Sequence, residues 1–185
     1  MKHFSVFAHA RFRQRWLSLV SFGMRPVLAA LFLCFGSYST AHGIVPQAPL
    51  PSWAEQMWLT LSRSSNLQLS TRLNPCTWRG DFNGDGRADL ALLVTHTESK
   101  KEGIAFLLQG RKPLVVGAGT DFGNGGDDFS WMDLCYVEER GTKHGNYKGQ
   151  SVSLQSDGLV VAKESSASAL IYLRKGKLQW HQYGD

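Results

Sequence analysis

The sequence predicts a mainly β fold, in which one short N-terminal helix precedes a small antiparallel meander or sandwich-like domain. From residue 76 onward, short apolar runs alternate with turn signals such as Ser-Asp-Gly at residues 156–158 and Lys-Gly at residues 175–176. These signals recur about every eight to twelve residues, a spacing typical of antiparallel all-β domains. We therefore expect about six to eight strands in a single domain.

The first predicted element is a short amphipathic helix that begins at Ser52. Residues 44–51 contain three prolines and are expected to form an extended leader. Ser52 and Glu55 have the spacing of a capping box, which marks a helix start. Three apolar side chains then share one helical face, at Trp53, Met57 and Leu61. That spacing favours a helix packed on a sheet over an aromatic ligand platform.

The predicted strands follow a polar connection over residues 62–75. Residues 90–94 are apolar on both faces, so this strand is expected to be central in its sheet. The glycine-rich residues 117–128 and the polar residues 139–150 are expected to be surface loops. The strand-like runs from which these strands are expected to form cover residues 76–79, 90–94, 104–108, 112–116, 129–137, 152–154, 159–162, 167–173 and 178–180.

Residues 1–43 have the features of a secretory signal peptide. Basic residues up to Arg25 precede an apolar run over residues 26–35, and small and polar residues follow it. The apolar run has half of the roughly twenty residues that a spanning helix needs, so we expect no membrane span after cleavage. The sequence from Met24 would make a compact signal by itself, which suggests Met24 as an alternative translation start.

The organisation that follows has three parts. Residues 1–43 are the signal, residues 44–75 are the leader and helix, and residues 76–185 are the β domain. Cys34 lies in the signal, but bulky Phe32 and Leu33 precede it where a lipidation site needs small residues. We therefore expect a soluble periplasmic or secreted product.

The net charge of +5 does not indicate an acidic partner. The excess of Lys and Arg lies wholly in residues 1–43, and from residue 44 onward basic and acidic residues are equal in number, at fifteen each. A nucleic-acid groove needs an excess of cations on the folded domain. The composition therefore argues against nucleic-acid binding.

Two cysteines, Cys76 and Cys135, are left after removal of the signal. An even pair in an oxidising compartment predicts a disulfide. Such a bond closes a loop of about sixty residues and contributes about 4 kcal/mol in the chain-entropy account. The alternative is a pair of buried thiols.

Residues 81–89 have the pattern of a calcium loop. Side-chain oxygens stand at loop positions 1, 3, 5 and 9, and glycine stands at position 6. Calcium takes six to eight oxygen ligands at about 2.3–2.6 Å on a sharply folded backbone. The alternative is a plain hairpin turn, because Asn-Gly and Asp-Gly favour positive φ. A plain turn does not need three mutually repelling carboxylates in nine residues, so the pattern favours a cation.

The stretch DFNGDGRADLALLV, residues 81–94, resembles the calcium-loop core of FG-GAP and VCBS repeats. The resemblance implies Ca²⁺ held by the side-chain oxygens of Asp81, Asn83, Asp85 and Asp89 and by the backbone carbonyl of Arg87. The motif occurs once, whereas a propeller needs at least four blades of about 40–50 residues. We therefore expect the loop on a lone sheet, with an affinity of about 10⁻⁴–10⁻³ M.

EF-hand and dockerin loops open in the same way but differ in how they close. They need an acidic ligand at position 12, which is Leu92 here, and a helix after it. Residues 90–94 are strand-like, so the sequence argues against both. A second acidic cluster over residues 121–128 fits no metal-loop spacing, and we interpret it as a glycine-rich surface loop.

Catalysis finds little support in the sequence. His96, His144 and His181 are scattered, and no Gly-x-Ser-x-Gly or His-Glu-x-x-His motif occurs. We expect a monomeric, non-catalytic calcium-binding protein whose partner is a protein bound at the loops over 117–128 and 139–150. The alternatives are an inhibitor or immunity protein against a cell-wall hydrolase or toxin, a cell-surface adhesion module and, less favoured, a hydrolase.

Overall fold

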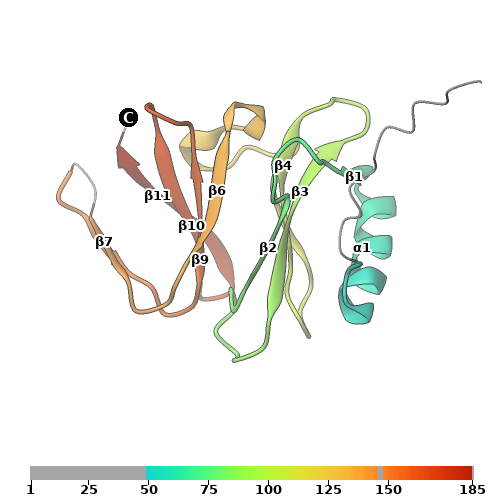
Figure 1. The fold of residues 1–185 in the computed structure, drawn as a ribbon, viewed down its shortest axis with the longest axis horizontal. Helices are drawn as coiled ribbons and strands as arrows, with labels where there is room; N and C mark the ends of the chain where they lie inside the picture. The colour runs from blue at the N-terminus through green and yellow to red at the C-terminus, as the bar shows by residue number, and fades with distance from the viewer. Residues whose placement is uncertain (1–48, 146–147, 185) are drawn as a thin grey trace, which may run out of the picture. The chain divides into compact units, whose positions relative to one another are not determined.

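The computed structural model describes residues 49–145 and 148–184. In this part of the chain, one α-helix, α1 (Ser52–Ser64), packs on the first of two antiparallel sheets that face each other (Figure 1). The predicted mainly β fold with one N-terminal helix is confirmed, and it is not a propeller. The predicted signal peptide, Met24 and Cys34 lie outside the described residues. No helix within the described ranges is long and apolar enough to span a bilayer.

Eleven strands are present in the described residues, more than the six to eight predicted. Sheet A contains β1 (Leu67–Leu69), β2 (Thr77–Gly80), β3 (Asp89–His96), β4 (Glu102–Leu107) and β5 (Leu114–Gly117). Sheet B has the order β11-β10-β9-β6, with β6 (Leu134–Glu138), β9 (Gly158–Ala162), β10 (Ser168–Arg174) and β11 (Lys177–Gly184). A separate hairpin consists of β7 (Lys143–Gly145) and β8 (Ser151–Ser153).

Strand β3 is central in sheet A, as its two apolar faces predicted. It pairs with β4 along one edge, and with both β1 and β2 along the other. Leu92 and Val94 face the helix layer, whereas Ala91 and Leu93 face sheet B. Successive side chains of a strand point to opposite faces, so a strand buried on both sides must be apolar throughout.

Helix α1 covers the outer face of sheet A. Ala54 and Leu61 are buried against that face, and Trp53, Met57 and Trp58 pack beside them. The predicted capping box at Ser52 is not formed. Ser52 is already helical, Pro51 is the N-cap residue, and no side chain caps the start. The Pro51 carbonyl accepts hydrogen bonds from the N–H groups of Ala54 and Glu55 at 2.8 and 2.9 Å.

The main core lies between the two sheets. Phe82 and Phe106 meet edge to face in it, with ring centroids 5.3 Å apart. Leu159 and Ile171 enter the same core from sheet B. Each fully buried side chain of this kind contributes about 1.5–3 kcal/mol relative to an exposed one. Trp78 also crosses the layers, because its Nε1–H donates to the Cys135 carbonyl at 2.9 Å.

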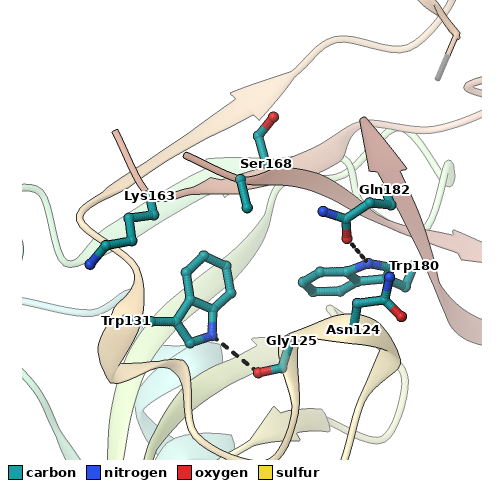
Figure 2. Close-up of a pocket in the computed structure, with 8 residues that line it drawn as sticks. Asn124, Gly125, Trp131, Lys163, Ser168, Trp180 and Gln182 are labelled. Atoms are coloured by element: carbon teal, nitrogen blue, oxygen red, sulfur yellow. Dashed lines mark hydrogen bonds between the residues drawn. The ribbon is translucent and has the colours of Figure 1, made fainter. Parts of the chain in front are cut away.

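The loop between β5 and β6 differs most from the sequence prediction. The predicted strand over 129–137 is wrong at its start, where η2 (Phe129–Trp131) is a 3₁₀ turn. A second short turn, η1 (Gly123–Gly125), precedes it. Together with β10 and β11 these turns line a pocket at one end of the sandwich (Figure 2). Residues 139–150 are not all loop either, since they include β7.

Candidate metal site

The calcium-type loop closes the hairpin between β2 and β3. Gly80 pairs with Asp89, so residues 81–89 turn the chain back on itself between two paired strands. Gly84 and Gly86 have φ of 75° and 82°. This left-handed region favours glycine, which explains both glycines of the motif.

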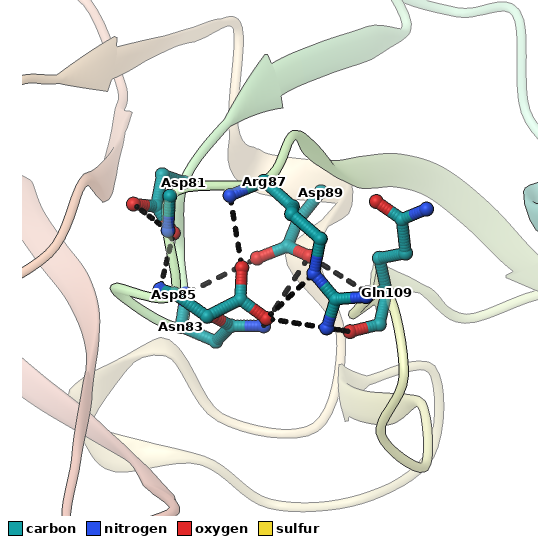
Figure 3. A network of polar contacts seen from close by, with 7 residues as sticks. Asp81, Asn83, Asp85, Arg87, Asp89 and Gln109 are labelled. Carbon is teal, nitrogen blue, oxygen red and sulfur yellow. Dashed lines mark hydrogen bonds and ion pairs between the residues drawn. The ribbon is translucent and has the colours of Figure 1, made fainter.

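Asp81 and Asn83 organise the backbone of the loop (Figure 3). The two carboxylate oxygens of Asp81 accept from the N–H groups of Asp85 and Gly86 at 3.0 and 2.9 Å. The Asn83 Oδ1 accepts from the Asp85 N–H at 2.8 Å. Loop positions 1 and 3 therefore present their oxygens toward the inside of the loop, as a cation site requires.

Asp85 forms an ion pair with Arg87 on the exposed side of the loop. Its Oδ2 accepts from Arg87 Nη2 at 2.8 Å and from Asn83 Nδ2 at 3.1 Å. The Arg87 N–H donates to Oδ1 at 2.9 Å. Hydrogen bonds from the Arg87 side chain and backbone lower the pKa of Asp85 to about 2. The sequence pattern predicts only a backbone role for Arg87, but its guanidinium also donates to the Gln109 carbonyl at 2.9 Å.

Asp89 is the buried member of the set, with 0% of its surface exposed. Its Oδ1 accepts from the Gln109 N–H at 2.7 Å, and its Oδ2 accepts from the Asn83 N–H at 3.1 Å. Burial raises the pKa of this carboxyl, and the nearby charges of Asp85 and Asp81 raise it further against the two backbone donors. A nearby cation would offset both the burial of this carboxylate and its repulsion by the other two, so this environment favours cation binding.

The donor set of the loop fits a hard cation. Three carboxylates, one amide oxygen and one backbone carbonyl supply oxygen ligands, and one guanidinium offsets one of the three negative charges. Within residues 49–145 and 148–184, however, no three acidic, histidine or cysteine side chains already converge as a metal cage. The Asp85 carboxylate is turned to Arg87 and Asn83 instead. Uptake of a cation therefore requires Arg87 to release Asp85.

Asp157, which the sequence predicts only as part of a turn, anchors the loop to the opposite sheet. Its Oδ2 accepts from the Asp81 N–H at 2.7 Å, and its Oδ1 accepts from the Arg140 N–H at 3.0 Å. The Asp157 N–H returns a hydrogen bond to the Asp81 carbonyl at 3.0 Å. An Asp in an Asp-Gly turn is common, so nothing local in the sequence signals this contact. The loop therefore joins both layers of the sandwich.

The second acidic cluster is used in local structure. Asp127 forms an ion pair with Lys101. The Asp128 Oδ1 accepts from the N–H groups of Glu102 and Ser130 at 2.9 and 3.0 Å, which caps η2 and ties it to β4. Partial burial opposes ionisation, but these donors together hold the pKa of Asp128 below its usual value.

An ion pair between the exposed Arg72 and the buried Glu102, beside this cluster, was not predicted from the sequence. Glu102 is 7% exposed and accepts from Ser70 Oγ at 2.9 Å and from Arg72 at 2.6 Å. Arg72 Nη1 also donates to the Met132 carbonyl at 2.7 Å. Arg72 therefore links the segment after β1 to β4 and to the chain before β6.

Cys76 and Cys135 contribute to the same core between the sheets. Cys135 is buried within this core, and half-buried Cys76, which immediately precedes β2, packs against the core. In the structure they are thiols and not a disulfide. Burial raises the pKa of the Cys135 thiol well above its usual value. The disulfide stays a prediction.

Comparison of the chain with protein-family models, curated protein sequences and solved structures finds no match in any of the three. The candidate site therefore rests on its residues and geometry.

Proposed function

We propose that this protein is an exported, non-catalytic binding protein whose loop at residues 81–89 takes up Ca²⁺ as a structural cation. The observation that carries the proposal is the fully buried Asp89, held at the base of a loop that contains two further carboxylates. Asp81, Asn83, Asp85, Asp89 and the Arg87 carbonyl would hold the ion. When bound, it would neutralise carboxylates whose mutual repulsion opposes folding.

The position of the loop supports a stabilising role. Gln109 connects Asp89 to the chain after β4, and Asp157 connects Asp81 to the chain before β9. A cation at this point would stiffen the contact between the two sheets. In the proposal a predicted Cys76–Cys135 disulfide braces the same core, and a protein partner binds the monomer at the loops over 117–128 and 139–150.

Thermal unfolding of the purified protein in calcium and in EGTA tests the metal proposal. With an affinity of about 10⁻⁴–10⁻³ M, 10 mM calcium is expected to raise Tm by about 4–10 °C. Asp85→Asn should abolish the rise, because it removes a charged ligand. Asp121→Asn is the matched control, since it removes a carboxylate outside the loop. Equal Tm values in calcium and EGTA for the native protein would overturn the proposal.

The partner is tested by retention of proteins from a periplasmic extract, with and without calcium. One stoichiometric protein supports the proposed role. If the protein is instead retained on a glycan or a cell surface, an adhesion module is favoured. Turnover of a cell-wall substrate by the protein would contradict a non-catalytic role.

The disulfide is tested by counting thiols in the denatured, exported protein. Oxidation is expected to leave neither Cys76 nor Cys135 reactive with a thiol reagent until a reductant is added. Two reactive thiols in protein taken directly from the oxidising compartment would contradict the predicted bond.

A further inference from the structure

A pocket that the calcium proposal does not use lies at one end of the sandwich. It has a volume of about 270 Å³ and lies between the η1–η2 loop, the turn after β9, and strands β10 and β11. Its walls include two indoles, one cation and three neutral polar side chains, from Trp131, Trp180, Lys163, Asn124, Ser168 and Gln182 (Figure 2).

The two indoles are held in fixed positions. Trp131 Nε1–H donates to the Gly125 carbonyl at 3.1 Å, and Trp180 Nε1–H donates to Gln182 Oε1 at 2.8 Å. Both rings also pack on the buried Phe129, with centroid distances of 5.9 and 6.1 Å. With their N–H groups satisfied and their rotamers fixed, the rings lose little entropy when a ligand binds.

Two glycines are needed for this arrangement. A Cβ at Gly123 would lie 2.3 Å from the Trp180 side chain, and a Cβ at Gly125 would lie 2.8 Å from it. The absence of side chains at these positions lets the loop approach the indole closely. The glycine-rich character of residues 117–128 therefore has a specific consequence, which is the shape of this pocket.

Two polar groups at the pocket, the Lys163 ammonium and the Asn124 amide, are available to a ligand, whereas the Gln182 amide already bonds Trp180 and the Gly184 carbonyl. No hydrogen bond or ion pair within the described residues uses the ammonium of Lys163 or the side-chain amide of Asn124. No acidic side chain lines the pocket. The pocket thus combines apolar ring faces, neutral hydrogen-bonding groups and one positive charge.

We propose that this pocket binds a saccharide ring that carries a carboxylate. The C–H groups of a pyranose ring carry partial positive charge and complement the negative face of an indole. Ring hydroxyls can pair with Asn124 and Ser168, and the carboxylate with Lys163. The inference goes beyond the proposed function and holds whether or not the loop at 81–89 binds calcium.

Other ligand classes fit the pocket less well. A purely aromatic ligand would bury the Asn124 amide without a hydrogen-bond partner, which is unfavourable. A proline-rich peptide needs an extended aromatic groove, whereas this pocket has room for about one ring. A hydroxylated ring with a negative charge satisfies both the amide and the ammonium.

The test titrates the protein with two matched pairs of sugars in NMR experiments. N-acetylmuramic acid and glucuronic acid carry a carboxylate, and N-acetylglucosamine and glucose are their neutral counterparts. Acidic sugars are expected to shift the indole N–H signals of Trp131 and Trp180 but not that of the buried Trp78. The acidic member of each pair should bind about fivefold more tightly, in calcium and in EGTA alike, as one partly exposed ion pair allows.

Variants separate the pocket from the rest of the protein. Lys163→Gln should remove the preference for the acidic sugar, while the matched surface variant Lys112→Gln should keep it. Trp131→Ala should lose binding, and Trp131→Phe tests the same wall if the alanine variant fails to fold. The inference would be overturned if neither acidic sugar shifts the indole signals at tens of millimolar. It would also be overturned if a proline-rich peptide shifts these signals and the sugars do not.

Discussion

Arg87 occupies the position that decides how the loop responds to a cation. In the proposed site, its guanidinium and an incoming Ca²⁺ would compete for the same carboxylate oxygen of Asp85. Its backbone carbonyl is at the same time one of the proposed ligands. Without calcium, Arg87 would therefore substitute for part of the cation's charge.

Replacing this side chain should strengthen calcium binding. Arg87→Ala keeps the backbone carbonyl but frees Asp85, so we expect affinity to rise by on the order of fivefold. In EGTA the variant should melt at a lower temperature than the native protein, because the carboxylates lose their one cationic partner. Calorimetric titration measures the affinity, and Arg111→Ala is a control with the same change of charge outside the loop. Weaker binding by Arg87→Ala would contradict the proposed competition.

Among single residues, the sequence indicates the proposed ligand oxygens but not the residues that contact them. Loop spacing identifies Asp81, Asn83, Asp85 and Asp89, and positive φ explains Gly84 and Gly86. The contacts from Gln109 and Asp157 join residues twenty or more positions apart. Such contacts depend on how the strands pair and pack, which no local pattern encodes.

Between elements, η2 is held in place by the Asp128 carboxylate together with Arg72, which donates to the Phe129 carbonyl at 3.4 Å. Asp128 caps this turn and accepts from the Glu102 N–H of β4 through the same oxygen. Loss of the charge weakens both hydrogen bonds together. This links the stability of the β5–β6 loop to the ionisation of one side chain.

Acidification should therefore destabilise this corner in a predictable direction. The pKa of Asp128 is lower in the folded state than in the unfolded chain. Its contribution to stability is thus present above about pH 4 and is lost as the pH falls through the folded-state value. Asp128→Asn keeps an accepting oxygen but loses the charge, so its free energy of unfolding should be lower than that of the native protein by about 1 kcal/mol at pH 7. In acid, where the native carboxyl is protonated, the two stabilities should become equal. Chemical unfolding across this range measures the difference, and a constant gap would contradict the role of ionisation.

The sequence predicts long elements better than short ones. Strand β3 and helix α1 each bury a regular apolar pattern, so their periodicity is visible. Strand β1 has three residues in a polar segment and forms because β3 offers a free edge. Buried Phe129 opens η2 and buried Met132 follows it, so the two lie three residues apart, which is a turn spacing. Phe129 and Trp131, two residues apart, give the appearance of strand alternation. The Asp-Phe-Ser start was a capping signal that could have identified the turn.

In the whole molecule, an ionic contact connects separate segments of the chain in addition to the apolar core. Arg72 and Glu102 join β4 to the chain on either side of the sandwich. Removing Arg72 is costly, because the buried Glu102 carboxylate is then left without its charged partner. The Arg72–Glu102 pair therefore contributes more to the relative placement of these segments than to the net free energy of unfolding.

Removal of Arg72 alone should be strongly destabilising. We expect Arg72→Met to lower the free energy of unfolding by about 2–4 kcal/mol, since Arg72 is itself partly exposed. Arg72→Met combined with Glu102→Gln should recover part of this loss, because no uncompensated charge is left. Arg140→Met serves as an exposed control. Denaturant unfolding measures all of these, and a double variant no more stable than Arg72→Met would contradict the account.

A crystal structure of the protein grown in millimolar calcium is the most direct test of the proposed calcium site at residues 81–89. We expect one ion bound to Asp81, Asn83, Asp85, Asp89 and the Arg87 carbonyl at about 2.3–2.6 Å, with the Arg87 guanidinium moved away from Asp85. An intact Arg87–Asp85 pair with no ion in the loop under those conditions would contradict the proposed site.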